Sequence, residues 1–139
     1  MTVLEYGSPI TLASAKRAVE AAEQEAHKQE LAVIIAVVDS GSQLVMLHRM
    51  DHAQYGSIPV AQAKAKCAVE FKRSTKQFED ALVQGGMGFR MLSVDGIALF
   101  EGGLPLLESG RIIGAIGVSG ARSDQDGVIA AAGVAALSS

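Results

Sequence analysis

Two aliphatic hairpin patterns restrict the fold of this chain more than any other feature of its sequence. Each consists of two aliphatic runs around a short turn that contains Ser-Gly: residues 32–38 and 44–50 in the first, and 104–107 and 111–118 in the second. Aliphatic segments separated by so few turn-forming residues are typical of antiparallel hairpins. Together with a short apolar run at residues 97–100, they predict one antiparallel sheet of about five strands.

Helical periodicity flanks and separates the two hairpins. Apolar residues recur at steps of three and four after Thr11, over residues 58–83 with a break near Arg73, and after Ser123. Ser123 with Asp126 resembles a helix capping box. The order of elements predicts an α/β fold of the α+β kind, in which helices pack on an antiparallel sheet. The length of 139 residues favours one domain over residues 1–139.

Composition excludes several classes of protein. Lys and Arg number 12 against 15 Asp and Glu, a net charge of −3, whereas an extended nucleic-acid surface needs a basic excess. The longest apolar run near the N-terminus, at residues 31–38, is far shorter than the roughly 20 residues of a membrane span. No secretion signal is apparent, which predicts a cytoplasmic protein without a membrane partner. The single cysteine, Cys67, excludes an internal disulfide.

Glycines and two cations form the predicted ligand site. Glycines occur at residues 102–103 and recur over residues 114–120 of the last strand. Glycine inside a strand marks a bulge or a close approach of another group. These glycines therefore form either a bare backbone floor that binds an anion or flat ligand, or a tight contact between sheet and helix. A cationic side chain near such a floor would meet an acid group of the ligand. The candidate ligand-binding residues are Arg49, Lys64, Gly102, Gly103, Leu104, Pro105 and Gly120.

Few residues are candidates for metal ligation or catalysis. His48 and His52 are candidate heme or metal ligands, although either is also consistent with an ordinary hydrogen-bonded histidine. Asp51 and Glu101 are candidate groups for acid–base catalysis. Neither the G-x-G-x-x-G fingerprint nor a P-loop is present, so no nucleotide cofactor is expected. Cys67 lies in the predicted apolar stripe of the middle helix, where packing is the expected role.

The sequence resembles the GlcG/HbpS family over nearly its whole length, from about Leu12 to Leu137. Eight short segments occur in the family's order. They are residues 37–41 (Val-Val-Asp-Ser-Gly), 49–51 (Arg-Met-Asp), 56–58 (Gly-Ser-Ile), 63–65 (Ala-Lys-Ala), 73–75 (Arg-Ser-Thr), 100–106 (Phe-Glu-Gly-Gly-Leu-Pro-Leu), 114–120 (Gly-Ala-Ile-Gly-Val-Ser-Gly) and 125–126 (Gln-Asp). The sequence departs from the family pattern in two places: Glu101 replaces a glycine, and Ala121-Arg122 replaces Gly-Thr.

The resemblance implies a profilin-like fold that assembles into homo-oligomers. Members of the family include heme-binding sensor proteins, a heme-binding domain of some cobalamin adenosyltransferases, and proteins encoded beside glycolate or diol utilisation genes. We therefore expect a small-molecule ligand, with heme or another tetrapyrrole favoured and its propionates meeting Arg49 or Lys64. Two alternatives remain open. One is a catabolic isomerase, lyase or hydrolase in which Arg49 anchors a carboxylate while Glu101 or Asp51 moves a proton. The other is a non-catalytic oligomeric assembly module.

Overall fold

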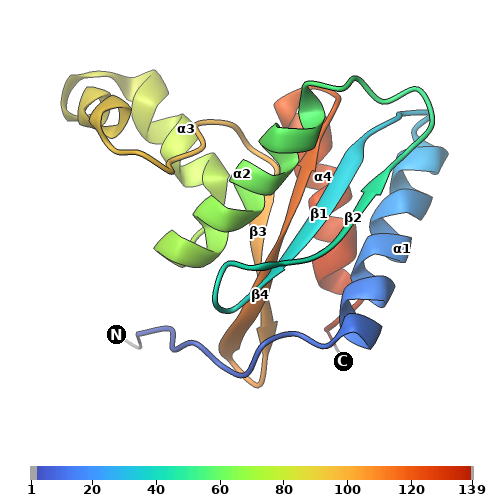
Figure 1. Cartoon of the computed structure of the whole chain (residues 1–139). Coiled ribbons are helices and arrows are strands. Elements are labelled where there is room, and N and C mark those ends of the chain that lie inside the picture. Colours follow the sequence, from blue (N-terminus) through green and yellow to red (C-terminus); the bar gives the residue numbers. More distant parts are fainter. Residues whose placement is uncertain (1–2, 139) are drawn as a thin grey trace.

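A four-stranded antiparallel sheet separates helices on its two faces (Figure 1) in the computed structural model, which describes residues 3–138. The elements, in chain order, are α1 (Leu12–Lys28), β1 (Ile34–Asp39), β2 (Leu44–Arg49), α2 (Ser57–Phe71), α3 (Thr75–Gln84), the 3-10 helix η1 (Gly86–Ser93), β3 (Gly103–Glu108), β4 (Arg111–Ser119) and α4 (Ser123–Ala135). Helices α1 and α4 cover one face and α2 covers the other.

The two predicted hairpins are confirmed and join into one sheet with the strand order β2-β1-β4-β3. Pairing between β1 and β4 connects them, with Ile34 opposite Ser119 and Asp39 opposite Gly114. Strands β2 and β3 are therefore the two edges of the sheet. This order matters for the site, because residues of the first hairpin's outer strand lie across the whole sheet from those of β3.

The fifth predicted strand, at residues 97–100, does not form: this segment is an extended connection without a strand partner in the described chain. The buried Ala98 packs in a cluster with Cys67 and Phe78, and its N–H donates a hydrogen bond to the Cys67 sulfur (3.3 Å). A short apolar run indicates burial, but it does not distinguish a strand from a buried connection.

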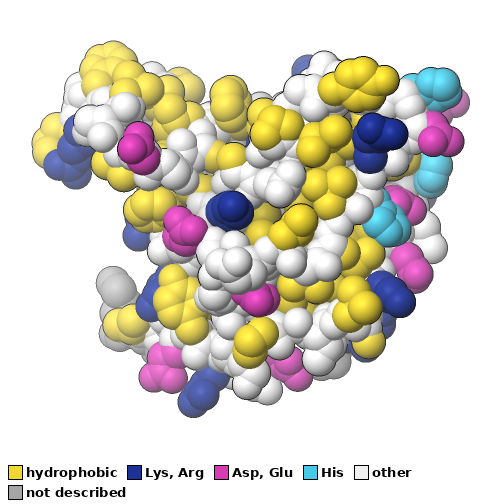
Figure 2. Space-filling model, in the orientation of Figure 1, with side chains coloured by type: hydrophobic (Ala, Val, Ile, Leu, Met, Phe, Trp, Pro, Cys, Tyr) yellow, Lys and Arg dark blue, Asp and Glu magenta, His cyan; other side chains and the backbone are white. Residues whose placement is uncertain are grey.

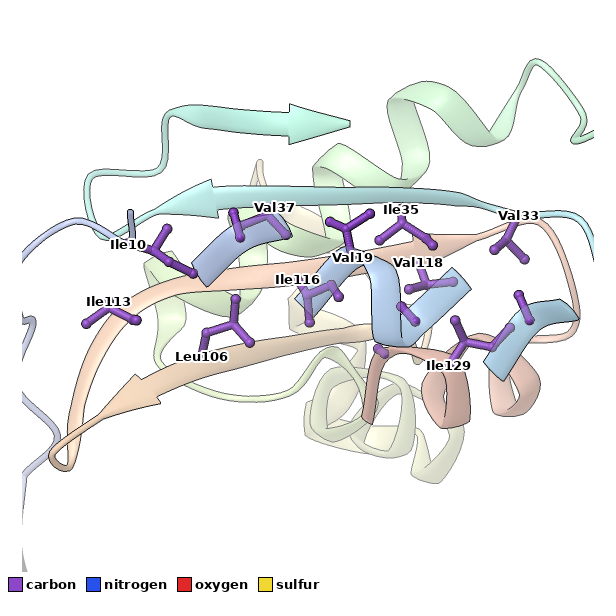
Figure 3. Close-up of a cluster of buried hydrophobic side chains, with 14 residues drawn as sticks. Ile10, Val19, Val33, Ile35, Val37, Leu106, Ile113, Ile116, Val118 and Ile129 are labelled. Atoms are coloured by element: carbon purple, nitrogen blue, oxygen red, sulfur yellow. The ribbon is translucent and has the colours of Figure 1, made fainter. Parts of the chain in front are cut away.

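The larger core cluster lies between the sheet and the helices α1 and α4. Val33, Ile35 and Val37 of the first hairpin face Val19 of α1, and Ile129 of α4 completes the layer (Figure 3). All five side chains have no exposed surface. Alternate residues of β1 thus supply this face, as the twofold period of a strand requires.

Helix α2 packs on the opposite face through small side chains. A Cβ added to Gly117 would lie 2.0 Å from the Ala61 carbonyl oxygen, so the glycine permits close approach of helix and sheet. Ala65 is fully buried in this contact. The sequence pattern predicts an apolar stripe of Val60, Ala63, Cys67 and Phe71 on this helix, and this prediction was wrong in part, because Ala63 is exposed and Val60 only half-buried. The helix carries alanines on several of its sides, so the hydrophobic pattern alone did not indicate which side is buried.

Helix α3 and η1 form an arm that projects away from the sheet (Figure 1). Several of its large apolar side chains are exposed, including Val83, Met87, Phe89 and Leu92, and η1 has no buried residue. Within residues 3–138 no helix combines the length and apolar character needed to cross a bilayer.

Candidate functional site

A surface hollow of about 460 Å³ lies where the C-terminal end of α1 meets the end of β2. Its lining residues are Glu23, His27, Glu30, Leu31, Ala32, Arg49, Met50, Asp51 and His52. Figure 2 shows histidines gathered along this margin of the molecule, among side chains of both charges. The hollow is thus mixed in charge, with apolar groups contributed by Leu31, Ala32 and Met50.

The connection between β2 and α2 forms a second hollow, of about 550 Å³, that shares residues with the first. The Arg49 guanidinium lies 5.8 Å from the centre of the Tyr55 ring, a cation–π contact that orients the exposed arginine. His52 has a φ of +71°, a left-handed conformation that histidine adopts more readily than most residues. Arg49, Asp51 and His52 therefore line both hollows.

His48 lies beside this region on the face of the sheet that α1 covers. Its Nδ1 is in close contact with the Glu23 carboxylate of α1, and the two side chains are 42% and 28% exposed. Because an ionised carboxylate only accepts hydrogen bonds, Nδ1 is the donor in this contact.

Lys64, a predicted ligand-binding residue, lies in the interior with 2% of its side chain exposed. Its ammonium donates hydrogen bonds to the Val118 carbonyl (2.9 Å) and to Asp126 Oδ2 (3.1 Å). Both partners belong to the protein itself, so the ammonium does not face a ligand. Asp126 Oδ1 also accepts the Ala121 N–H (3.0 Å). Burial raises the pKa of the Asp126 carboxyl, and the Lys64 ammonium opposes that rise.

The predicted capping role of Asp126 was therefore wrong. Helix α4 begins after Arg122, whose backbone N–H donates to the Gln125 side chain (3.1 Å), while Asp126 points into the core. Sequence reasoning treated Lys64 and Asp126 separately because they are 62 positions apart. A lysine beside an apolar helical stripe was the available signal, since a buried ammonium needs an acidic partner.

The glycine stretch at the start of β3 lies beneath α2. A Cβ on Gly103 would come within 2.4 Å of the Lys64 carbonyl oxygen, and one on Gly102 within 2.8 Å of the Lys64 ammonium. The Gly103 N–H donates to the Thr75 hydroxyl (2.9 Å) and is buried. Both glycines thus serve a tight contact between sheet and helix, one of the two roles that the sequence left open.

The remaining candidates divide between two regions. Leu104 and Pro105 are half-buried in β3, at the opposite edge of the sheet from Arg49. Gly120, with a φ of +143°, packs against Ala32 and so lies behind the first hollow. The structure therefore separates the cationic Arg49 from the glycine floor with which the sequence analysis had combined it.

Glu101 and Asp51, the candidate acid–base groups, are not brought together. The Glu101 N–H donates to Glu79 of α3 (3.1 Å), and its carboxylate packs where a Gly127 side chain would be, near the start of α4. Loss of solvation raises the pKa of Glu101. Asp51 is exposed and lines the hollows beside Arg49, whereas Glu101 lines neither.

The fold and these hollows define a small α+β protein whose sheet is covered on both faces and whose β2 edge carries histidine and arginine beside an open surface. The chain belongs to the HbpS-like family: the family model described as "Haem degrading protein HbpS-like" matches residues 10–135.

Two curated relatives agree with this family. An uncharacterized 15.0 kDa protein from the dhaT-dhaS intergenic region of Citrobacter freundii is 36% identical over 87% of each chain. Protein GlcG of Escherichia coli strain K12 is 37% identical over 73% of this chain and 74% of its own.

Three solved structures share the fold. Klebsiella pneumoniae protein ORFY has a TM-score of 0.88 at 31% identity, covering 99% of this chain and 96% of its own. HbpS has a TM-score of 0.86 at 31% identity, with coverage of 98% and 95%. The complex of PduOC with heme has a TM-score of 0.82 at 27% identity, with coverage of 92% and 94%. The predicted family and the α+β fold are therefore confirmed, with four strands rather than five.

Proposed function

We propose that the protein binds heme or a closely related tetrapyrrole in the hollow at the end of β2. The observation that carries the proposal is the arrangement of this edge, where Arg49 and His52 line one open surface and His48 contacts Glu23, another residue of its lining. The heme complex of the structurally similar PduOC supports the choice of ligand.

The residues present fit such a group. His48 and His52 are the candidate axial ligands, and Arg49 is placed to meet a propionate by a charge-assisted hydrogen bond. Leu31, Ala32 and Met50 provide apolar contact for the macrocycle. When bound, heme would supply an iron centre whose reactivity depends on its axial ligand and the polarity around it.

A bare metal ion fits less well. Among the described residues, no three His, Cys, Asp or Glu side chains converge to hold a metal. A protein zinc site needs three or four such ligands. Heme iron already has four nitrogen ligands from the macrocycle, so one histidine is enough to attach it.

Hemin titration followed by visible absorption tests the proposal. We expect a shifted Soret band with the wild type, loss of that band when the ligating histidine is replaced (His48→Ala or His52→Ala), and weaker binding for Arg49→Gln. Arg111→Gln is the matched control, since Arg111 is an exposed arginine on β4. An unchanged Soret band with the wild type, or binding that survives replacement of both histidines, would refute heme ligation at this edge.

A second candidate function is catalysis on a small carboxylate. Arg49 and Asp51 line the same hollows, which would place a base next to an anchored acid group. Glu101, the other predicted acid–base residue, lies on the far side of the sheet from Arg49 and would not contribute there. A thermal-shift panel of small carboxylic acids tests this function, and the absence of any ligand whose stabilisation depends on Arg49 would refute it.

We also propose that the protein self-associates through the arm formed by α3 and η1. Met87 and Val83 of this arm are 72% and 80% exposed, and exposed apolar patches of this kind mark interaction surfaces (Figure 2). Light scattering on Met87→Glu should show a lower mass than the wild type, whereas Val128→Glu, an exposed valine of α4, should not. A monomeric wild type would refute the assembly.

A further inference from the structure

We propose that a third hollow, at the opposite end of the sheet from the end of β2, binds a free amino acid with an aliphatic side chain. This hollow has a volume of about 420 Å³. It lies where the start of α1, the turn between β3 and β4, and the residues that follow α4 come together (Figure 1). It shares no lining residue with the two hollows at the end of β2 and is more enclosed than either. The inference is therefore independent of the proposed heme binding.

One positive and one negative side chain line this hollow. Arg17 belongs to the second turn of α1, Glu108 is the last residue of β3, and both are exposed. Within residues 3–138 neither takes part in an ion pair, with the other or with a third residue. A ligand that carries both a carboxylate and an ammonium group would give each of these charges a partner.

The ends of two helices add to this separation of charge. Ser14, in the first turn of α1, lines the hollow, and the N-terminal end of a helix carries a partial positive charge. Ser138 lines it just beyond α4, whose C-terminal end is partially negative and has no basic residue in its last turn. The carboxylate of the ligand would thus meet Arg17 beside the start of α1, and its ammonium would meet Glu108.

Aliphatic side chains form the apolar part of the wall. Ile113 is buried, Leu137 is half-buried, and Leu107 is 41% exposed. Because covering apolar surface is favourable, these side chains favour a ligand with an aliphatic group. The volume lies near the lower end of the range of about 300–1,000 Å³ for small-molecule pockets, which favours a ligand as small as one amino acid.

Other classes of ligand fit this lining less well. A simple carboxylate or phosphate would be repelled by Glu108, and a simple amine would be repelled by Arg17. The described residues that line the hollow include no histidine or cysteine, so the iron of a heme would find no nitrogen or sulfur ligand there. A zwitterion is the class of ligand for which both charges of the hollow are attractive.

Heteronuclear NMR of the isotopically labelled full chain, titrated with L-leucine, tests the proposal. We expect saturable shifts of the backbone amide signals of Ser109 and Gly110, which line the hollow in the turn between β3 and β4. Isocaproate lacks the ammonium group, isoamylamine lacks the carboxylate and glycine lacks the side chain, so each should bind more weakly than L-leucine. The absence of shifts with L-leucine, or equal affinity for L-leucine and isocaproate, would overturn the proposal.

Charge-neutral variants test the two side chains separately. Arg17→Gln and Glu108→Gln should each weaken L-leucine binding about two- to fivefold, the contribution of an exposed ion pair. Arg17→Gln should also discriminate less against isoamylamine, and Glu108→Gln less against isocaproate, changes that a merely structural role would not produce. Lys16→Gln is the matched control, since Lys16 is an exposed cation next to Arg17 that does not line the hollow. Unchanged affinity and selectivity in both variants would overturn the assignment.

Discussion

Replacement of Lys64 by methionine should destabilise the protein far more than replacement of any exposed lysine on the same helix. Lys64 and Asp126 are each 2% exposed, so the substitution leaves a buried carboxylate without its counter-charge. Removing one partner of a buried pair typically costs about 3–5 kcal/mol. Asp126 keeps the hydrogen bond from the Ala121 N–H, which favours the low end, about 3 kcal/mol.

Urea unfolding followed by circular dichroism measures this effect. With a slope of about 2 kcal/mol per molar urea, a loss of about 3 kcal/mol lowers the midpoint by about 1.5 M. Lys66→Met is the matched control, because Lys66 is an exposed lysine two residues along α2. A loss below about 1 kcal/mol in Lys64→Met, equal to that of the control, would refute the reasoning.

The cost of Lys64→Met should also depend on pH. Burial already raises the pKa of Asp126, and loss of the ammonium removes the opposing influence. A carboxyl with a raised pKa in the folded state contributes stability below its unfolded pKa, near 4, and that contribution is lost as pH rises through the folded value. The difference in unfolding free energy between variant and wild type should therefore be smaller at pH 5 than at pH 8. A difference that grows on acidification would contradict this sign.

Three further outcomes are expected. Gly117→Ala should lower the free energy of unfolding by about 1–3 kcal/mol, because its Cβ would overlap the Ala61 carbonyl, while Gly56→Ala, which has open space around it, should be near neutral. Thr75→Val should cost about 1–3 kcal/mol in urea unfolding by leaving a buried backbone N–H of β3 without an acceptor; an effect below that of Gly56→Ala would argue against this hydrogen bond. Burial raises the pKa of the Cys67 thiol, so a thiol reagent at pH 8 should react slowly with the native protein and rapidly in denaturant; equal rates would contradict the burial.

Local patterns predicted most of the secondary structure. The Ser-Gly turns located both hairpins, and the break near Arg73 correctly divided the middle helical stretch into α2 and α3. The error at residues 97–100 has a physical origin, because Ala98 is buried by Cys67 and Phe78 rather than by a neighbouring strand. An apolar run in a sequence predicts that the segment is buried, but it does not indicate which element packs against it.

The candidate site was predicted less well than the fold. Three of the predicted candidates, Arg49, Asp51 and His52, do line common hollows. Lys64, which was predicted to bind a ligand, pairs with Asp126 instead of facing a hollow. Glu23 was missed as a partner of His48, because a glutamate on the polar side of an amphipathic helix has no local feature that distinguishes it from Glu20.

Spacing along the chain determined which residues form helices and strands, and the order of motifs determined the family. Those properties follow from backbone geometry and from periods of two and 3.6 residues, which act over a few neighbours. Tertiary packing alone decided which charges meet. The pairs Glu23–His48 and Lys64–Asp126 join elements that are far apart in the sequence. The interaction between charges depends on their distance in space, which is set only when helices α1, α2 and α4 pack on the sheet.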